Sequence, residues 1–211
     1  SVFKHIQDES KPENKAELVQ IVRQKNEQDR EASVAMSRHQ IGEGLEIYNK
    51  ADKVQAFATK DDARMHIVSE WANSDKSKIM LAYTNQDTKK MNEYARVIMR
   101  EQGKLKGEDV QIDTNKGKLS LAEGEQIVFN KTDKDIGVLN GTRGKIEGID
   151  KRDNGEIVLK VQTDKGKKLE IGSDKSKDIS HGYATTIHKS QCMTVDNSYV
   201  LASKSMNANL A

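Results

Sequence analysis

KIMLAYTNQDTKKMNEYARVIMREQG, residues 78–103, is the stretch that decides the fold. Residues 78–84 form a short and nearly continuous apolar run, which is typical of a strand buried on both faces of a parallel sheet. The segment after it repeats side chains at the helical spacing i, i+3, i+4, i+7, namely Met91, Tyr94, Ala95 and Ile98. This pattern predicts an amphipathic helix that ends at Gly103. A strand followed by such a helix predicts one unit of an α/β fold.

The residues before this unit are predicted to be mostly helical. Strong helix formers follow polar starts in DREASVAMSRH (29–39), and a second helix is expected over IGEGLEIYNK (41–50). Residues 60–74, KDDARMHIVSEWANS, place four apolar residues on one face of a predicted amphipathic helix: Ala63, Ile67, Val68 and Trp71.

Residues 106–177 change to a period of two, which is typical of strands. Short strands are predicted in EQIVFN (125–130), GKIEGI (144–149), EIVLKVQT (156–163) and KKLEIG (167–172). Turns are predicted where glycine follows Asn or Lys, at Gly117, Gly141, Gly155 and Gly166. Five or six strands in about 70 residues favour a small antiparallel barrel. The sequence therefore predicts an α/β domain interrupted by a β-barrel.

Composition limits the classes of partner. Lys and Arg number 35 against 33 Asp and Glu, so the net charge is +2 and any nucleic-acid contact must come from local clusters. A single cysteine excludes an internal disulfide and a zinc-ligand spacing, and it fits a reducing, cytoplasmic environment. No apolar run approaches ~20 residues, the length of a membrane-spanning helix. The start at Ser1 and the end in NANLA (207–211) lead us to expect a fragment of a longer protein.

HGYATTIHKSQCMTVD, residues 181–196, gathers hydrogen-bonding groups beside the apolar segment SYVLA (198–202). A helix beginning near Thr185 would present free backbone N–H groups, which attract phosphate. Hydroxyl groups donate to phosphate oxygens, and Lys189 adds a full charge. The stretch therefore suits a phosphate-rich ligand, with a simple polar helix end as the alternative. A serine hydrolase is a poor match, because no nucleophile-elbow glycines flank Ser190.

The same stretch resembles motif V of superfamily 1 DNA helicases, in the form found in RecD and in the conjugative relaxase-helicases of the TraA type. The resemblance rests on Tyr183, Ala184, Thr186, His188, Lys189, Ser190, Gln191, Thr194 and Asp196. It implies contacts to single-stranded DNA from Thr185, Thr186, His188, Lys189 and Ser190. It also implies that Gln191 and Cys192 approach ATP. Cys192 departs from the family glycine, and its Cβ and thiol would crowd a close backbone approach to phosphate.

Two further segments support the resemblance. ELVQIVRQKNEQDREAS (17–33) is similar to the family's motif IV, which makes Arg23 the implied catalytic residue and places Arg23 and Gln24 at ATP. An arginine there would neutralise charge on the transferred phosphoryl group. IMLAYTNQ (79–86) is similar to the family's second-domain strand, where Thr84 and Asn85 hold a DNA phosphate. Thr84 is also suited to capping a helix, and the two roles can coexist.

The segment GEQIVFNKTDKDIGVLNGTRGKIEGID (124–150) resembles the family's SH3-like insert, called 2B. The resemblance implies an α/β, RecA-like parallel-sheet domain with an inserted small antiparallel SH3-like β-barrel. Its parts would be residues 1–105 for the first section of the RecA-like domain, 106–178 for the insert, and 179–211 for the return to the RecA-like domain.

The chain contains no GxxxxGKS or GxxxxGKT phosphate loop and no Walker B acids. The resemblance then implies the second motor domain of an ATP-dependent DNA helicase, the helicase part of a conjugative transfer relaxase. ATP and Mg would be bound mainly by the first RecA-like domain of the same protein, and this chain alone would be inactive. Its partners would be that domain and single-stranded DNA. The alternatives are a RecD-type repair helicase and a non-catalytic nucleic-acid-binding or assembly module.

The implied role of Arg23 gives a prediction for the intact protein. Arg23→Ala should abolish ATP turnover, because the γ-phosphate would lose its neutralising guanidinium. Affinity for single-stranded DNA should stay largely unchanged, because this arginine contacts the nucleotide. Steady-state ATPase rates and a DNA-binding titration on the same variant check the two halves, and a wild-type ATPase rate would remove the assignment.

Overall fold

The computed structural model describes residues 27–37, 41–51, 53–75, 77–172, 174–190 and 195–202. Contacts divide the chain into two compact units, one of Ser1–Ala56 with Met206–Ala211 and one of Phe57–Ser205. In the first unit, α2 (Glu27–Ser37) packs against α3 (Ile41–Lys50). Ala32 and Ala35 of α2 are buried. Both helices predicted for this part of the sequence are confirmed.

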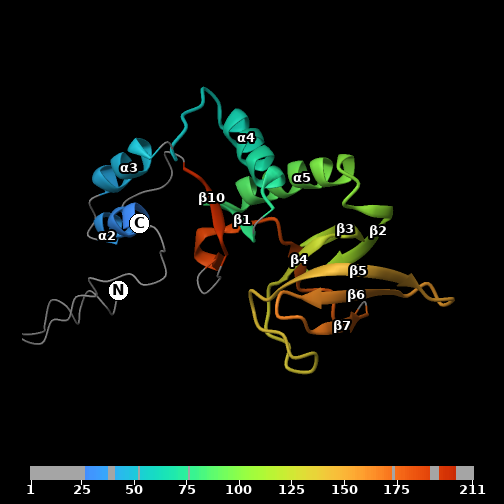
Figure 1. The fold of residues 1–211 in the computed structure, drawn as a ribbon. Helices are drawn as coiled ribbons and strands as arrows, with labels where there is room; N and C mark the ends of the chain where they lie inside the picture. The colour runs from blue at the N-terminus through green and yellow to red at the C-terminus, as the bar shows by residue number, and fades with distance from the viewer. Residues whose placement is uncertain are drawn as a thin grey trace, which may run out of the picture. The chain divides into compact units, whose positions relative to one another are not determined.

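The second unit contains a parallel sheet of strands that lie far apart in the sequence. Its order is β10-β1-β9, with β1 (Lys78–Ala82) in the centre, β10 (Asn197–Leu201) on one side and β9 (Ala184–Thr186) on the other. Both neighbours run parallel to β1, and Figure 1 shows β10 beside it. The predicted buried parallel strand is therefore confirmed, and its partners come from the C-terminal end of the chain.

Helices α4 (Lys60–Asn73) and α5 (Asn85–Glu101) pack against each other and against this sheet. Their contact is built from Trp71 and Val68 of α4 and from Met91 and Ala95 of α5, all fully or almost fully buried. The predicted apolar faces of both helices are confirmed. Helix α5 is capped by Gln102, and the chain turns at Gly103, whose φ of 67° is costly for other residues.

The helix expected to begin near Thr185 is wrong. Thr185 and Thr186 belong to β9, where they pair with Leu81 and Ala82 of β1. A short 3-10 helix, η2 (Ile187–Ser190), follows instead. Because their β-carbons are branched, the two threonines suit a strand better than the first turn of a helix.

The insert consists of antiparallel strands in two sheets, with a core of its own. One sheet pairs β2 with β3, and the other has the order β7-β6-β5-β4-β8. The strands are β2 (Lys106–Thr114), β3 (Gly117–Glu123), β4 (Gln126–Phe129), β5 (Arg143–Lys151), β6 (Ile157–Thr163), β7 (Lys168–Ile171) and β8 (Ile179–His181). All four predicted strands and all four predicted turn glycines are confirmed. The SH3-like closure of these strands stays a prediction.

A buried carboxylate joins the insert to the parallel sheet. Glu125 lies just before β4 and is 0% exposed. Arg96 of α5 donates from Nε to its Oε2 at 2.9 Å, and the hydroxyl of Tyr183 donates to its Oε1 at 2.6 Å. Burial and the charge of Glu125 raise the pKa of Tyr183, so this hydroxyl keeps its proton for the carboxylate. Tyr183 also packs edge-on against Trp71, with ring centroids 5.2 Å apart.

A second buried carboxylate, Asp87, joins α4 to the start of α5. Its Oδ1 accepts from the guanidinium of Arg64, and its Oδ2 lies 2.7 Å from Nζ of Lys60. Burial opposes ionisation, but hydrogen bonds from Lys60, Thr84 and Arg64 outweigh it and lower the pKa of Asp87 to about 2. Both helices thus depend on one ionised group.

Replacing Tyr183 by Phe should lower the free energy of unfolding by about 2 kcal/mol, because the buried Glu125 loses a donor. Tyr199→Phe is the matched control, since Tyr199 is half-buried and its hydroxyl makes no hydrogen bond within the described residues. Urea unfolding at neutral pH measures both variants. Equal losses in the two would contradict the role given to the hydroxyl.

Asp87 should make the fold acid-sensitive over a defined range. Its folded-state pKa of about 2 lies below the unfolded value near 3.8, so its contribution is present above about pH 4 and is lost as the pH falls toward 2. The loss should amount to about 2 kcal/mol. Urea unfolding at several pH values should show that Asp87→Asn does not lose this free energy of unfolding between pH 4 and pH 2.

The matched control is Asp113→Asn, which removes an exposed carboxylate of β2 that forms no ion pair within the described residues. It should keep the wild-type slope of stability against pH between pH 4 and pH 2. If Asp87→Asn kept that slope too, the carboxylate would not be the source of the acid sensitivity.

Candidate nucleic-acid interface

The predicted DNA-contacting residues gather at the C-terminal edge of the parallel sheet. Strands β1 and β9 run in the same direction with Ala82 level with Thr186, so both chains leave the sheet at this edge. Tyr83, Thr84 and Asn85 follow β1, and η2 follows β9. The rings of Tyr83 and His188 lie 6.5 Å apart at 48°. Ligands of open α/β sheets bind at this edge, outside the carboxyl ends of the strands.

Thr84 is the N-cap of α5. Its Oγ1 accepts from the backbone N–H of Asp87 at 3.1 Å and donates to Oδ2 of Asp87 at 2.6 Å. Asn85, the first residue of the helix, is exposed. The N-terminus of a helix of 17 residues carries partial positive charge from free N–H groups, and Arg64 and Lys60 balance the one acidic residue of its first turn.

The two threonines of β9 are buried, Thr185 at 7% and Thr186 at 8% exposure. The residues of η2 differ, because His188 and Lys189 are exposed while Ser190 is half-buried. The hydroxyl of Ser190 donates to the carbonyl of Ile187 at 2.7 Å, which closes the turn on itself. His188 and Lys189 are therefore the side chains that η2 offers to a ligand.

Lys189 lies where the parallel sheet meets the insert. Its Nζ donates to Oδ1 of Asn130 at 3.2 Å, and Asn130 directly follows β4. Partial burial lowers the pKa of Lys189, and the nearby charge of Lys116 lowers it further. No carboxylate pairs with Lys189 among the residues that the structure describes, so its charge is left for a ligand.

The predicted nucleotide-contacting residues, Arg23, Gln24, Gln191 and Cys192, lie outside the described residues. The described part of the predicted DNA interface comprises Thr84, Asn85 and residues 185–190. These eight positions come from two strand ends that are about 100 residues apart in sequence, and the fold does bring them together.

The amide of Asn92 fixes β9 from the side of the helix. Its Oδ1 accepts from the backbone N–H groups of Tyr183 and Ala184, at 3.1 and 2.8 Å, and its Nδ2 donates to the carbonyl of Ala184 at 3.1 Å. These three hydrogen bonds satisfy backbone groups that would otherwise have to pair with a neighbouring strand. The position of β9, and with it that of η2, is therefore set by α5.

The insert fixes the segment before β9. Gly182 passes so close to β4 that a Cβ would lie 2.8 Å from the backbone carbon of Ile127, which a larger residue does not allow. The guanidinium of Arg143 lies within 3.4 Å of three oxygens, the carbonyls of Lys78 and Gly182 and Oε1 of Gln126. Arg143 thus bridges β5 to β1 and to the segment before β9, and burial lowers its pKa.

Sequence reasoning missed these positioning residues. Asn92 sits on the buried face of α5, and a polar residue at the helical spacing of apolar ones is a signal for a buried hydrogen bond. Glu125 has the same kind of signal, an acid directly before an apolar strand. Arg143 and Asn130 resemble ordinary residues of a turn, and nothing in the local pattern sets them apart.

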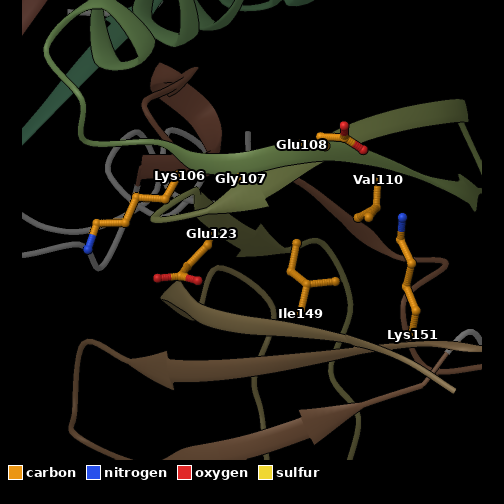
Figure 2. Close-up of a pocket in the computed structure, with 7 residues that line it drawn as sticks. All are labelled: Lys106, Gly107, Glu108, Val110, Glu123, Ile149 and Lys151. Atoms are coloured by element: carbon orange, nitrogen blue, oxygen red, sulfur yellow. The ribbon is translucent and has the colours of Figure 1, made fainter.

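A pocket of about 400 Å³ lies elsewhere, between β2, β3 and β5. Figure 2 shows its lining, which mixes two lysines and two glutamates with apolar side chains: Lys106, Gly107, Glu108, Val110, Glu123, Ile149 and Lys151. The charges of the lining cancel, and none of the predicted site residues is among them. The sheet edge therefore remains the candidate interface.

Within the described part of the chain, no helix is both long and apolar enough to cross a membrane. The same residues contain no group of three or more His, Cys, Asp or Glu side chains arranged to hold a metal ion.

Comparison with known sequences finds relatives among conjugal transfer proteins. The chain is 32% identical over 199 residues to the conjugal transfer protein TraA of Agrobacterium fabrum and 31% identical over 204 residues to the probable conjugal transfer protein TraA of Sinorhizobium fredii. Each match covers 92% of this chain and 18% of the relative, so the chain spans about a fifth of the length of these proteins. No family model matches the chain.

Comparison with solved structures finds the fold of Pif1 helicases. The Pif1 helicase from Bacteroides in complex with ADP-AlF3 and ssDNA superposes with a TM-score of 0.56, 18% identity, and coverage of 90% of this chain and 46% of that one. The Pif1 helicase from Candida albicans gives a TM-score of 0.51 at 17% identity, over 86% of this chain and 48% of that one. The Pif1 comparison shows a shared fold, and the resemblance to conjugal transfer proteins of the TraA type is confirmed: the chain is related in sequence to one segment of these proteins.

Proposed function

We propose that the chain is the second RecA-like motor domain of a DNA helicase within a conjugal transfer protein, and that its sheet edge grips single-stranded DNA by the phosphates. The similarity to TraA proteins over 92% of the chain supports the pathway. The shared fold with a Pif1 helicase that was solved with ssDNA supports the ligand. Under this proposal the RecA-like domain comprises residues 1–105 and 179–211, with the insert at 106–178. Strand β8 (Ile179–His181) pairs with β4, so the sheet of the insert extends three residues beyond that proposed boundary.

One observation carries the proposal: two distant segments that resemble helicase motifs end side by side at the same sheet edge. The register of Ala82 with Thr186 places the start of α5 beside η2. This brings the exposed Asn85 to the same edge as the exposed His188 and Lys189. If each segment resembled a helicase motif only by chance, the two segments would have no reason to lie side by side in the fold.

The groups at this edge suit a nucleic-acid backbone. The N-terminus of α5 offers partial positive charge, Asn85 an amide, and Lys189 an ammonium group, all of which donate to phosphate oxygens. His188 adds an exposed ring near that of Tyr83, and aromatic rings stack on bases of any sequence. We assign direct contacts to the exposed side chains. The buried Thr185 and Thr186, the capping Thr84 and Ser190 would act by holding the backbone in place.

The nucleotide would lie in a cleft with the first RecA-like domain of the same protein. ATP and Mg would be held mainly by that domain, while Arg23, Gln24, Gln191 and Cys192 would approach the phosphates from this one. ATP supplies the free energy of domain closure in this proposal. The part played by the described residues is to hold the strand: η2 is attached to β9, and Asn92 and Tyr183 fix β9 to α5 and to the insert. We place the protein in the cytoplasm and expect no ATP hydrolysis by this chain alone.

The proposal predicts how a lysine substitution changes DNA binding. Lys189→Ala should weaken binding of single-stranded DNA of every sequence, because a phosphate contact carries no sequence information. It should also lower the slope of log affinity against log salt concentration by about one. Fluorescence titration of oligo-dT and of a mixed-sequence oligonucleotide at several salt concentrations measures both effects.

Lys165→Ala is the matched control, because it removes an exposed lysine from the turn between β6 and β7, in the same unit of the chain. It should change the slope little. An unchanged slope in Lys189→Ala would remove η2 from the interface. Tight DNA binding by a whole protein that lacks ATPase activity would favour the non-catalytic binding module instead.

A further inference from the structure

We propose that Lys116, in the turn between β2 and β3, joins Lys189 in holding one and the same phosphate of the bound strand. The insert would then supply one wall of the DNA track, opposite the end of the parallel sheet. This inference rests on the proposed function, and it assigns a ligand to a surface that neither the motifs nor the comparisons assign.

A chain of hydrogen bonds holds the two lysines near each other. The backbone N–H of Asn115 donates to the carbonyl of Lys177 at 2.9 Å, and its Nδ2 donates to Oδ1 of Asp178 at 2.8 Å. Asn130 donates from Nδ2 to the carbonyl of Asp178 at 3.2 Å and accepts from Lys189 at Oδ1. Asp178 therefore ties the β2–β3 turn to the residue that holds Lys189.

The turn that carries Lys116 is itself well defined. The hydroxyl of Thr114 donates to the carbonyl of Gly117 at 2.6 Å and accepts from the backbone N–H of Lys116 at 3.2 Å. Gly117 has a φ of 103°, a conformation that glycine adopts at little cost. The backbone of Lys116 is thus fixed while its side chain is exposed.

The two ammonium groups form an uncompensated positive site. They lie close enough for Lys116 to disfavour the charged form of Lys189. Neither forms an ion pair with a carboxylate within the described residues, and Asp178, an acid of the bond network, accepts from the neutral amide of Asn115. Like charges at short distance are unfavourable unless an anion lies between them. A phosphate group has the charge and the oxygen atoms to accept from both.

The direct test uses the 211-residue chain and fluorescent oligo-dT. Lys116→Ala should weaken binding about tenfold at low salt and lower the salt slope by about one, since one charge-assisted contact to phosphate is lost. Lys118→Ala is the matched control, because it removes an exposed lysine from the same hairpin and has the same effect on net charge. It should weaken binding by no more than about twofold.

The double variant tests whether the phosphate is shared. If both Lys116 and Lys189 are needed to hold one phosphate, the loss of either one releases it, so Lys116→Ala combined with Lys189→Ala should lower the slope by about one, as each single change does. A fall of about two would mean that each lysine holds its own phosphate and would overturn the inference. Equal behaviour of Lys116→Ala and Lys118→Ala would overturn it as well, and would leave the proposed function untouched.

A second measurement separates a DNA phosphate from a free one. Inorganic phosphate and oligo-dT are titrated in turn into the chain while the side-chain NMR signals of Lys116 and Lys189 are followed. The inference expects both lysines to respond to oligo-dT at the lower concentration. A response to inorganic phosphate with no binding of oligo-dT would overturn the proposed function and the shared DNA phosphate, and would leave a free-anion site. No response to either probe would overturn the site altogether.

Discussion

The buried carboxylate of Glu125 is the constraint on which the arrangement of the second unit depends. A buried carboxylate without partners is very costly, so its position requires both Arg96 from α5 and the hydroxyl of Tyr183. These partners belong to different layers, one to the helix over the parallel sheet and one to the segment that enters that sheet. Because the carboxylate of Glu125 bonds to both Arg96 and Tyr183, the insert and the parallel sheet are held in a fixed arrangement at this point.

The covalent link at this place is short. Only Gly182 and Tyr183 separate β8, which pairs with β4 in the insert, from β9, which pairs with β1 in the parallel sheet. Arg143 adds contacts to the carbonyls of Gly182 and Lys78. A displacement of the insert would therefore be transmitted to β9 and to η2 directly after it. The position of Lys189 thus depends on residues of the insert as much as on its own strand.

Local patterns in the sequence predicted the longer elements well and the shortest strand of the parallel sheet poorly. The apolar run 78–84 and the helical spacing around Met91 predicted β1 and α5. Burial leaves a pattern of apolar residues in the element's own sequence, which can be recognised without knowing what the element packs against. The strand at Thr185 was mistaken for a helix start, since three residues are too few to show a period of two.

The residues that assemble the site were harder to predict for a different reason. Asn92, Arg96 and Glu125 are polar, and polar residues on a helix or before a strand are usually solvated. Their burial is decided by segments up to about 90 residues away, as the bonds of Asn92 to Tyr183 and Ala184 show. Lys116 has an ordinary turn sequence, and its closeness to Lys189 follows from the pairing of Asn115 with residues 177 and 178.

The balance of charge over the chain limits how the sheet edge could hold DNA in the proposed function. With a net charge of +2, the chain has little long-range attraction for a polyanion, so the proposed DNA binding would rely on contacts such as those of Lys189 and the N-terminus of α5. Such contacts go to phosphates and are indifferent to base sequence. Under that proposal each contact would carry a large share of the affinity, so a displacement of η2 by the length of a hydrogen bond would weaken binding. An edge held by the buried bonds of Asn92 and Tyr183 has the fixed geometry that a small number of contacts requires.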